Sequence, residues 1–195
     1  QIADDGEILV KGNNVFSAYR NNETATNEVI VDSWFHTGDI GELDHDGFLK
    51  ITGRKKELLV TTGGKNVAPA VLEDRLRGHP LVSQCIVVGD QRPFIGALIT
   101  LDAEMLPAWA ENNGIQGLSM DEARTNEVVL AEIQRAVDDA NKAVSKAESI
   151  RRFTVLPGDF TEANGYLTPS LKLKRSIVMT DYRSEVEALY SGPRE

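Results

Sequence analysis

The sequence predicts an α+β protein in which small sheets are covered by helices. Short apolar runs rich in β-branched residues, bounded by Gly, Asn, Asp and Pro, are typical of strands and turns. A longer stretch instead repeats its apolar residues at helical spacing, through Val129, Ile133, Val137, Ala140 and Val144. A chain of 195 residues is long enough for one to two domains with a buried core.

The N-terminal part of the chain indicates a few strands. Residues 8–10 form a short apolar run that reads as a strand. Residues 40–53 read as a hairpin, because the Asp-His-Asp-Gly run at residues 44–47 tolerates a tight turn. So small a sheet is marginal in water by itself. We therefore expect this segment to belong to a larger body.

The middle of the chain gives clearer signals. Residues 58–64 suggest a strand followed by a turn. A helix should begin near Pro69, since the missing N–H of proline costs nothing at the first helical position, and it should end at Gly78. Two apolar, β-branched runs, residues 85–89 and 95–101, indicate adjacent strands.

Further helices are expected toward the C-terminus. A capping-box pattern at residues 119–122 predicts the start of a long helix over residues 121–149. Its mixed charges favour a solvated amphipathic helix on a sheet over a partner-binding helix. We also expect a shorter helix over residues 106–113, an edge strand at 153–156 and a terminal helix at 182–190.

Composition argues against several classes of function. The chain has 21 Lys and Arg against 30 Asp and Glu, a formal net charge of −9, whereas nucleic-acid binding needs a basic face. The single Cys85 excludes an intramolecular disulfide and fits a reducing compartment. No apolar run approaches the roughly 20 residues that span a bilayer. We therefore expect a cytoplasmic protein with no transmembrane segment and no nucleic-acid partner.

Neither a hydrolase triad nor a metal centre is indicated. The histidines, His36, His45 and His79, lack the spacing of metal ligands, and the last two stand in turn-like contexts. We interpret all three as surface histidines. No metal ligand is assigned to this chain.

The first segment that could carry chemistry is the Trp-Phe-His-Thr-Gly-Asp run at residues 34–39. A carboxylate that follows glycine can approach two vicinal hydroxyls and accept a hydrogen bond from each, as acidic residues do with a ribose. Asp39 is therefore a candidate nucleotide-binding residue. On these residues alone, a carboxylate in a plain turn is the favoured interpretation.

The second segment begins with three consecutive cations, residues 54–56, and continues to a glycine pair. Such cations are costly to bury unpaired, so they face water or an anion, and Arg54 could contact a phosphate or a ribose. Gly63 and Gly64 lack side chains and allow a ligand to approach the backbone closely. A linker with a flexible turn is an equally good interpretation of the spacing.

The third segment, residues 167–175, combines a rigid Thr-Pro-Ser loop with alternating Leu and Lys. The alternation places Lys172 and Lys174 on one side of a strand-like stretch. A lysine presented from a loop is a mobile point charge suited to phosphate or carboxylate oxygens. The alternative is a basic edge that only discourages strand pairing.

Together and in this order, these segments resemble the adenylate-forming superfamily, which comprises acyl-CoA synthetases, luciferases and the adenylation domains of peptide synthetases. Residues 6–12, which open Gly-Glu-Ile-Leu-Val, are similar to a segment upstream of the Thr-Gly-Asp motif in that family. The last motif, Thr-Pro-x-x-Lys-Leu-Lys-Arg at residues 168–175, is most similar to that of bacterial long-chain fatty acid–CoA ligases. Many relatives carry Gly immediately before the lysine, where this chain has Leu171. Short-chain and amino-acid substrates are therefore less expected.

The resemblance implies a role for each candidate residue. Asp39 would bind the ribose hydroxyls of ATP and of the acyl-adenylate, with help from Arg54. Lys56 would be the hinge of a domain rotation. Lys172 would be the catalytic lysine of adenylation, stabilising charge as a carboxylate attacks the α-phosphate.

The resemblance also implies a coenzyme A site on the same domain. After rotation, Gly63 and Gly64 would line the pantetheine passage, and Lys65 would lie near a phosphate of CoA. The phosphate loop, the acyl pocket and the binding of Mg²⁺ would belong to the large N-terminal domain, upstream of this sequence. A chain that opens on a strand without Met is expected to begin within a protein.

On this resemblance, residues 1–55 are the C-terminal end of a large adenylation domain, with hairpin and barrel strands. Residues 56–195 are the small mobile C-terminal domain, a small mixed sheet flanked by helices. The parent enzyme would join a long-chain fatty acid to CoA through an acyl-adenylate, releasing AMP and diphosphate, and the chain alone would be inactive. The alternatives are an acyl-AMP ligase that loads a carrier protein and a non-catalytic lid or interaction module. Oligomeric state and peripheral membrane contact are left open.

Overall fold

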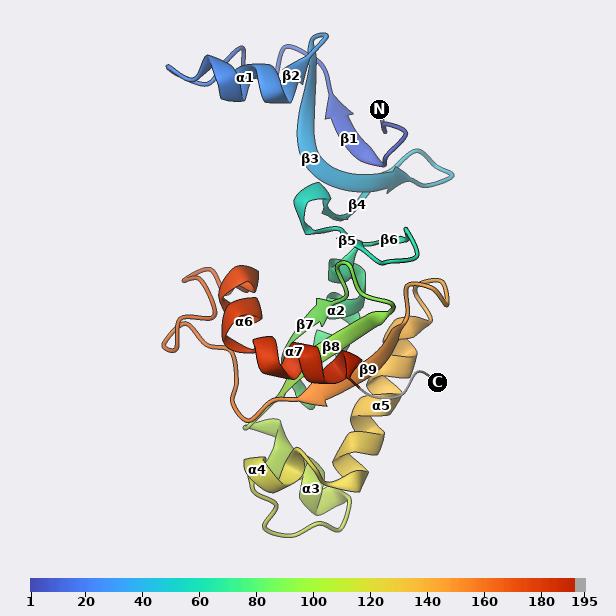
Figure 1. Ribbon diagram of the computed structural model, residues 1–195, viewed down its shortest axis with the longest axis vertical. Coiled ribbons are helices and arrows are strands. Elements are labelled where there is room, and N and C mark those ends of the chain that lie inside the picture. The colour runs from blue at the N-terminus through green and yellow to red at the C-terminus, as the bar shows by residue number, and fades with distance from the viewer. Residues whose placement is uncertain (192–195) are drawn as a thin grey trace. The chain divides into compact units, whose positions relative to one another are not determined.

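The computed structural model describes residues 1–191, which fall into two compact units, one of residues 1–58 and one that begins at Leu59 (Figure 1). The boundary between the units lies close to the domain limit expected after residue 55. Both units combine strands and helices. The α+β class is therefore confirmed.

The first unit is organised around one long strand, β3, which pairs with every other strand of a four-stranded antiparallel sheet. Gly47, at φ +85°, closes the expected β3–β4 hairpin after Asp44. The strands expected to belong to a barrel form no closed barrel in the described residues. The elements of this unit are β1 (Glu7–Val10), α1 (Glu23–Val29), β2 (Ile30–Val31), β3 (Trp34–Leu43), β4 (Leu49–Arg54) and the 3-10 turn η1 (Lys55–Glu57).

The second unit has a three-stranded sheet in the order β7-β8-β9, preceded by a small β5–β6 hairpin. β8 pairs antiparallel with β7 and parallel with β9, so the sheet is mixed, as expected. Its strands are β5 (Leu59–Val60), β6 (Asn66–Val67), β7 (Val82–Val88), β8 (Ile95–Leu101) and β9 (Ile150–Val155). Its helices are α2 (Pro69–Arg77), α3 (Met105–Asn112), α4 (Met120–Ala123), α5 (Glu127–Asn141), α6 (Arg175–Asp181) and α7 (Arg183–Tyr190).

Helices cover both faces of this sheet (Figure 1). Because side chains alternate along a strand, Cys85 and Val87 join a core with α2 and α5, whereas Ile86 and Val88 join a second core with α6 and α7. Every residue of β8 is buried, as in a strand covered on both sides. No helix in the described part of the chain has the length and apolar character needed to cross a membrane.

The prediction of one long helix over residues 121–149 is wrong. The capping box of Ser119 and Glu122 is present, but it opens only the short helix α4. Asn126 then interrupts the helix, because its side chain accepts hydrogen bonds from the N–H groups of Val128 and Val129 and starts α5. α5 ends at Asn141, whose amide side chain bonds to the backbone of Ile150.

The other expected elements of the second unit are found with small shifts of their ends. The helix after Pro69 is α2, the helix over 106–113 is α3, the edge strand is β9 and the terminal helix is α7. The strand-like interpretation of residues 172–175 is corrected. Leu173 forms only an isolated bridge with Leu167, and the chain enters α6 at Arg175.

Candidate functional site

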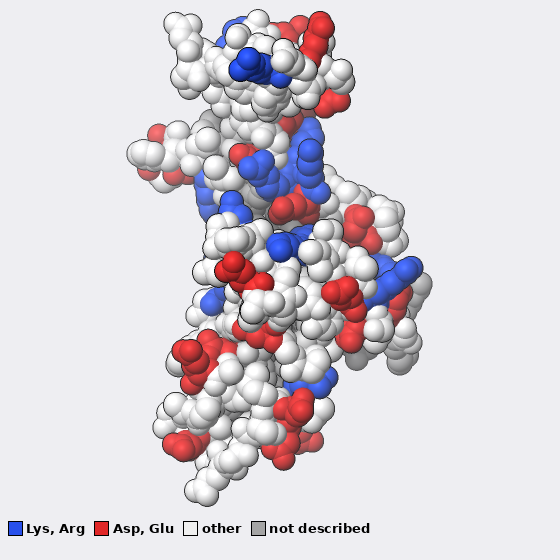
Figure 2. All heavy atoms as spheres, turned by 90° about the vertical axis from the view of Figure 1, so that its left-hand side faces the viewer, with Lys and Arg blue, Asp and Glu red and all other residues white. Residues whose placement is uncertain are grey.

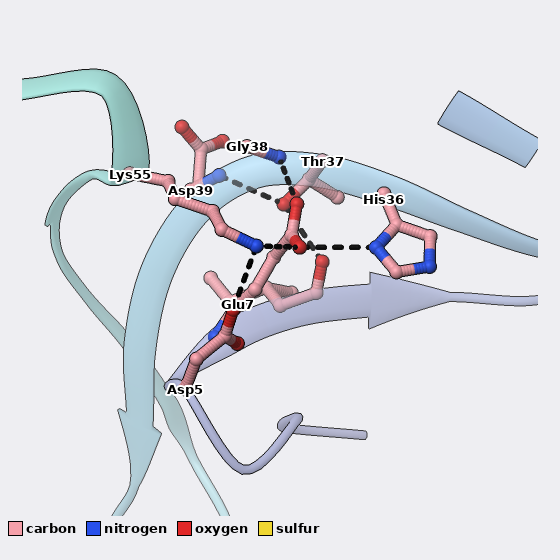
Figure 3. A network of polar contacts seen from close by, with 8 residues as sticks. Asp5, Glu7, His36, Thr37, Gly38, Asp39 and Lys55 are labelled. Atoms are coloured by element: carbon pink, nitrogen blue, oxygen red, sulfur yellow. Dashed lines mark hydrogen bonds and ion pairs between the residues drawn. The ribbon is translucent and has the colours of Figure 1, made fainter. Parts of the chain in front are cut away.

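A buried carboxylate, Glu7, organises the bend of β3 that contains the Thr-Gly-Asp motif (Figure 3). Its Oε1 accepts a hydrogen bond from the N–H of Gly38 at 2.9 Å. Its Oε2 accepts one from Lys55 Nζ at 2.8 Å and lies 3.0 Å from His36 Nδ1. Gly38 adopts φ +73°, a left-handed conformation that glycine allows without strain. The carboxylate thus fixes the backbone immediately before Asp39.

The hydroxyl of Thr37 fixes the same bend from the other side. It donates to the carbonyl of Ile8 at 2.8 Å and accepts from the N–H of Asp39 at 3.1 Å. Asp39 stands opposite Arg54 in the β3–β4 ladder, and Arg54 Nε lies 2.7 Å from Asp39 Oδ1. The structure therefore brings together the two residues expected to bind a ribose.

Lys55 ties the segment after β4 to the N-terminal residues of the same unit. Its ammonium lies 2.6 Å from Asp5 Oδ2 and 2.8 Å from Glu7 Oε2. The hydrogen bond to Asp5 and then that to Glu7 raise the pKa of Lys55, and the same contact lowers the pKa of Asp5. Burial by itself would raise the pKa of Glu7, but the hydrogen bonds from Lys55, His36 and Gly38 outweigh it and lower that pKa.

A cavity of about 440 Å³ opens beside this network, within the first unit. Aromatic side chains of Tyr19 and Phe35 line it together with the cations Arg54, Lys55 and Lys56. Lys56, the expected hinge residue, is exposed within η1. Asp39 does not line the cavity, although its partner Arg54 does.

In the second unit, Lys172 follows a tight loop closed by Thr168. The N–H of Thr168 donates to the carbonyl of Lys172, and the N–H of Leu171 donates to the carbonyl of Thr168, both at 2.8 Å. The hydroxyl of Thr168 also accepts from the N–H of Lys172 at 3.0 Å. Leu171 is left-handed, at φ +59°. This is the position after a tight turn that glycine usually occupies.

The loop before Lys65 has the same hydrogen bonds. Thr61 N–H donates to the carbonyl of Lys65 at 3.0 Å, Gly64 N–H donates to the carbonyl of Thr61 at 2.8 Å, and Thr61 Oγ1 accepts from the N–H of Lys65 at 3.2 Å. Gly64 takes the left-handed position at φ +75°. The left-handed conformation costs Leu171 about 1–2 kcal/mol, whereas Gly64 adopts it without this cost.

The two lysines that follow these loops differ in their partners. Lys65 Nζ lies 2.8 Å from Glu148 Oε1. Lys172 is exposed and forms no ion pair within residues 1–191. A side chain at Gly63 would meet only Thr61 Oγ1, at 3.8 Å, so packing within the chain does not require a glycine there. The candidates thus divide between the units, with Asp39, Arg54 and Lys56 in the first and residues 63–65 and 172 in the second.

Sequence reasoning missed the roles of Glu7 and Lys55. The one available signal was a charged residue at the start of an apolar strand, Glu7 before residues 8–10. The interpretation of all three histidines as surface residues is corrected for two of them. His36 is half-buried against Glu7, and half-buried His79 lies 3.1 Å from Glu132 Oε1, whereas His45 is exposed.

Charge is unevenly distributed over the second unit. Acidic side chains dominate the lower end of the face in Figure 2, where Figure 1 places α3 and α4. Exposed acidic residues of these helices and their flanks include Glu104, Glu111, Asp121 and Glu122.

The described residues contain no group of three or more His, Cys, Asp or Glu that could hold a metal ion.

Residues 56–194 match the family described as the AMP-binding enzyme C-terminal domain. The chain is 58% identical over 192 residues to the long-chain-fatty-acid–CoA ligase FadD15 of Mycobacterium tuberculosis, covering 98% of this chain and 32% of that protein. It is 37% identical to the putative fatty-acid–CoA ligase fadD11 of the same species, covering 98% of this chain and 34% of that protein. The chain therefore spans about a third of the length of these curated relatives.

The structure also resembles a solved adenylation domain. The match is to the adenylation (A) domain of the carboxylate reductase GR01_22995 from Mycobacterium chelonae, with a TM-score of 0.73 and 27% sequence identity. It covers 96% of this chain and 28% of that one. The matched part of this chain therefore includes residues of both units.

The Glu7 network predicts a loss of stability in acid. Folding lowers the pKa values of Glu7 and Asp5. At acidic pH the unfolded state therefore binds more protons than the folded state, and a fall in pH favours unfolding. Their contribution is present above the ordinary carboxyl pKa and is lost as the pH falls through the folded values. We expect the free energy of unfolding of the first unit to decrease between about pH 5 and pH 3, and Glu7→Gln to flatten that dependence.

Tryptophan fluorescence can measure this unit separately. The chain has two tryptophans, Trp34 in β3 and Trp109 in α3, so Trp109→Phe leaves a probe in the first unit alone. In this background, urea unfolding is followed at several pH values with and without Glu7→Gln. Glu42→Gln is the matched control, because Glu42 is exposed and 3.7 Å from Lys50. Equal pH profiles for Glu7→Gln and the unsubstituted protein would contradict the assignment.

Proposed function

We propose, from the premise that the chain belongs to the AMP-binding enzyme C-terminal domain family, that it forms the C-terminal part of an ATP-dependent long-chain fatty acid–CoA ligase. In the first half-reaction a fatty acid carboxylate attacks the α-phosphorus of ATP and diphosphate leaves. In the second, the thiol of CoA attacks the acyl-adenylate and AMP leaves. The 58% identity to FadD15 over nearly the whole chain is the observation that carries this proposal.

Asp39 and Arg54 are proposed to hold the ribose of ATP and of the adenylate. A carboxylate can accept hydrogen bonds from both hydroxyls of a ribose. The turn that presents Asp39 is fixed by Glu7 and Thr37, so the carboxylate is positioned before the nucleotide arrives. Mg²⁺ and the acyl chain are assigned to parts of the enzyme outside these residues.

Lys172 is proposed as the catalytic lysine of adenylation. Its exposed ammonium follows a rigid loop and has no carboxylate partner in residues 1–191, so its charge is available to a substrate. As the fatty acid oxygen attacks, negative charge on the α-phosphate can be stabilised by a positioned cation.

The second half-reaction is proposed to use the other loop of the same unit. Rotation about Lys56 withdraws Lys172 and brings the loop of Gly63 and Gly64 to the pantetheine arm of CoA. Lys65 then lies near a phosphate of CoA. Lys56, residues 62–65 and residues 169–172 are exposed, which supports this proposal.

The enzyme is proposed to work in the cytoplasm, because Cys85 is a buried free thiol, in keeping with a reducing compartment. Its proposed partners are a long-chain fatty acid, ATP and CoA. An acyl-AMP ligase that loads a carrier protein shares the first half-reaction and differs only in the acceptor. The test therefore includes both acceptors.

A chimera tests the proposed function. Residues 1–195 replace the corresponding third of FadD15, and the products are measured with palmitate, ATP and either CoA or a carrier protein bearing a pantetheine arm. We expect palmitoyl-CoA, AMP and diphosphate from the chimera and no turnover by the 195-residue chain alone. FadD15 rebuilt with its own third at the same junction is the control. An active control beside a chimera that forms no adenylate would refute the proposal, and transfer to the carrier protein alone would select the alternative.

Substitution of Lys172 should separate the two half-reactions. In the chimera, Lys172→Ala is expected to slow adenylate formation by about 10²–10³-fold, as for loss of one group that stabilises developing charge. Thioester formation from supplied palmitoyl-adenylate should change less than about twofold, since Lys172 has left the site. Lys146→Ala is the control for loss of an exposed lysine in the same unit. Equal losses in both half-reactions would rule out this role.

Proline at position 56 should impair the change between half-reactions. Lys56→Pro fixes a backbone dihedral that a hinge must change. Each half-reaction measured alone should remain close to that of the unsubstituted chimera, whereas overall turnover should fall at least about tenfold. Lys56→Ala removes the same side chain but keeps the backbone free, so it should retain turnover. Unaltered turnover with proline would count against a hinge at this residue.

A further inference from the structure

A buried ion pair joins the start of α6 to α2, on the open edge of the second unit's sheet. Arg175 Nη2 lies 2.6 Å from Glu73 Oε1, and their side chains are 24% and 7% exposed. We propose that Glu73 and Arg175 are positioning residues that set the place of Lys172 for adenylation. This inference rests on the proposed function.

Both residues bond to the backbone of the same residue of β7. Glu73 Oε1 accepts a hydrogen bond from the N–H of Val87 at 2.7 Å, and Arg175 Nη1 donates to the carbonyl of Val87 at 2.9 Å. β7 is an edge strand, and the backbone N–H and C=O of Val87 point away from β8. Glu73 and Arg175 therefore bond to the N–H and the C=O of Val87, the groups that a further strand would bond to at this edge.

The ion pair stands at the base of the hairpin that carries Lys172. Leu173 forms a bridge with Leu167, and the N–H of Lys174 donates to the carbonyl of Tyr166 at 2.8 Å. Arg175 follows directly. The stem is thus short, with few backbone contacts of its own. Leu167 anchors one strand of the stem in the core beside Ile86 and Val88, and the guanidinium of Arg175 ties the other strand, which carries Lys172, to β7.

Glu73 belongs to the helix that also follows the loop of Lys65. α2 begins at Pro69, shortly after β6, and its Leu72 and Leu76 are fully buried in the core. Loss of Arg175 should therefore loosen the strand of the hairpin that carries Lys172, although Leu167 stays buried in the core, whereas the loop of Lys65 is unaffected because α2 is held by its own apolar face. This difference separates a positioning role from a general loss of structure.

The ion pair is expected to contribute more to the direction of the chain at Arg175 than to the net stability of the fold. A buried ion pair gains little free energy over an apolar pair of equal size, because both charges lose their hydration. A guanidinium, however, donates several hydrogen bonds in fixed directions. Arg175 uses two of its nitrogens on two different partners, Glu73 and Val87, so the direction of the chain at Arg175 is fixed.

The activity test uses the chimera with Arg175→Met and Arg175→Lys. We expect Arg175→Met to lower kcat for adenylate formation by about tenfold or more, since misplacement of a catalytic group by about 1 Å can cost 10²-fold. The KM for ATP and the thioester half-reaction should change less than about twofold. Arg175→Lys should recover part of the rate, because an ammonium can still pair with Glu73. The matched control is Arg124→Met, because Arg124 also donates to a strand carbonyl, that of Val155.

Amide hydrogen exchange on the 195-residue chain gives a readout independent of activity. Arg175→Met should speed exchange in residues 166–174 by about tenfold and leave β8 unchanged. An inactive unsubstituted chimera would count against the proposed function, and exchange would still report whether Arg175 holds the hairpin. An active chimera in which Arg175→Met leaves adenylation unchanged, or slows both half-reactions equally, would overturn the positioning role.

Discussion

The second unit depends on the burial of both faces of β8. This strand has a neighbour on each side and a helical layer above and below, so its seven residues, Ile95–Leu101, are all removed from water. The alternation of β7 extends the same division, with Cys85 facing one core and Ile86 the other. The loop before Lys65 is attached to this sheet and its helices through α2, and the loop before Lys172 is attached through α6.

The first unit depends on a polar constraint rather than an apolar one. Glu7 is buried, and both its oxygens are used, by Gly38 on one side and by Lys55 and His36 on the other. A buried carboxylate is tolerated only with such partners. The same contacts that satisfy Glu7 fix the bend before Asp39 and the start of the segment that leads to Lys56. Order at Asp39, the proposed nucleotide-binding residue, and order at the proposed hinge therefore have one source.

Local signals predicted most of the elements, and distant pairings were missed. Pro69, Gly78 and the turn at residues 44–47 act on their own neighbours, and the elements they predicted are present. Asn126 shows the limit of a local capping signal, because the capping box at residues 119–122 opens only α4 and the side chain of Asn126 starts a separate helix. Lys55 is 48 residues from Glu7, and Arg175 is 102 residues from Glu73. A single sequence contains no local pattern that pairs residues so far apart. The motifs identified candidates such as Asp39 and Lys172 but not the residues that hold them.

The left-handed backbone at Leu171 has a consequence for chirality. A D-amino acid adopts this region as readily as an L-residue adopts the ordinary helical region, because the two are mirror images. The strain next to Lys172 is therefore set by the configuration of one α-carbon and not by crowding, since the side chain of Leu171 is 69% exposed. A semisynthetic chain with D-leucine at this position would keep the same side chain and the same hydrogen-bonded loop without the strain.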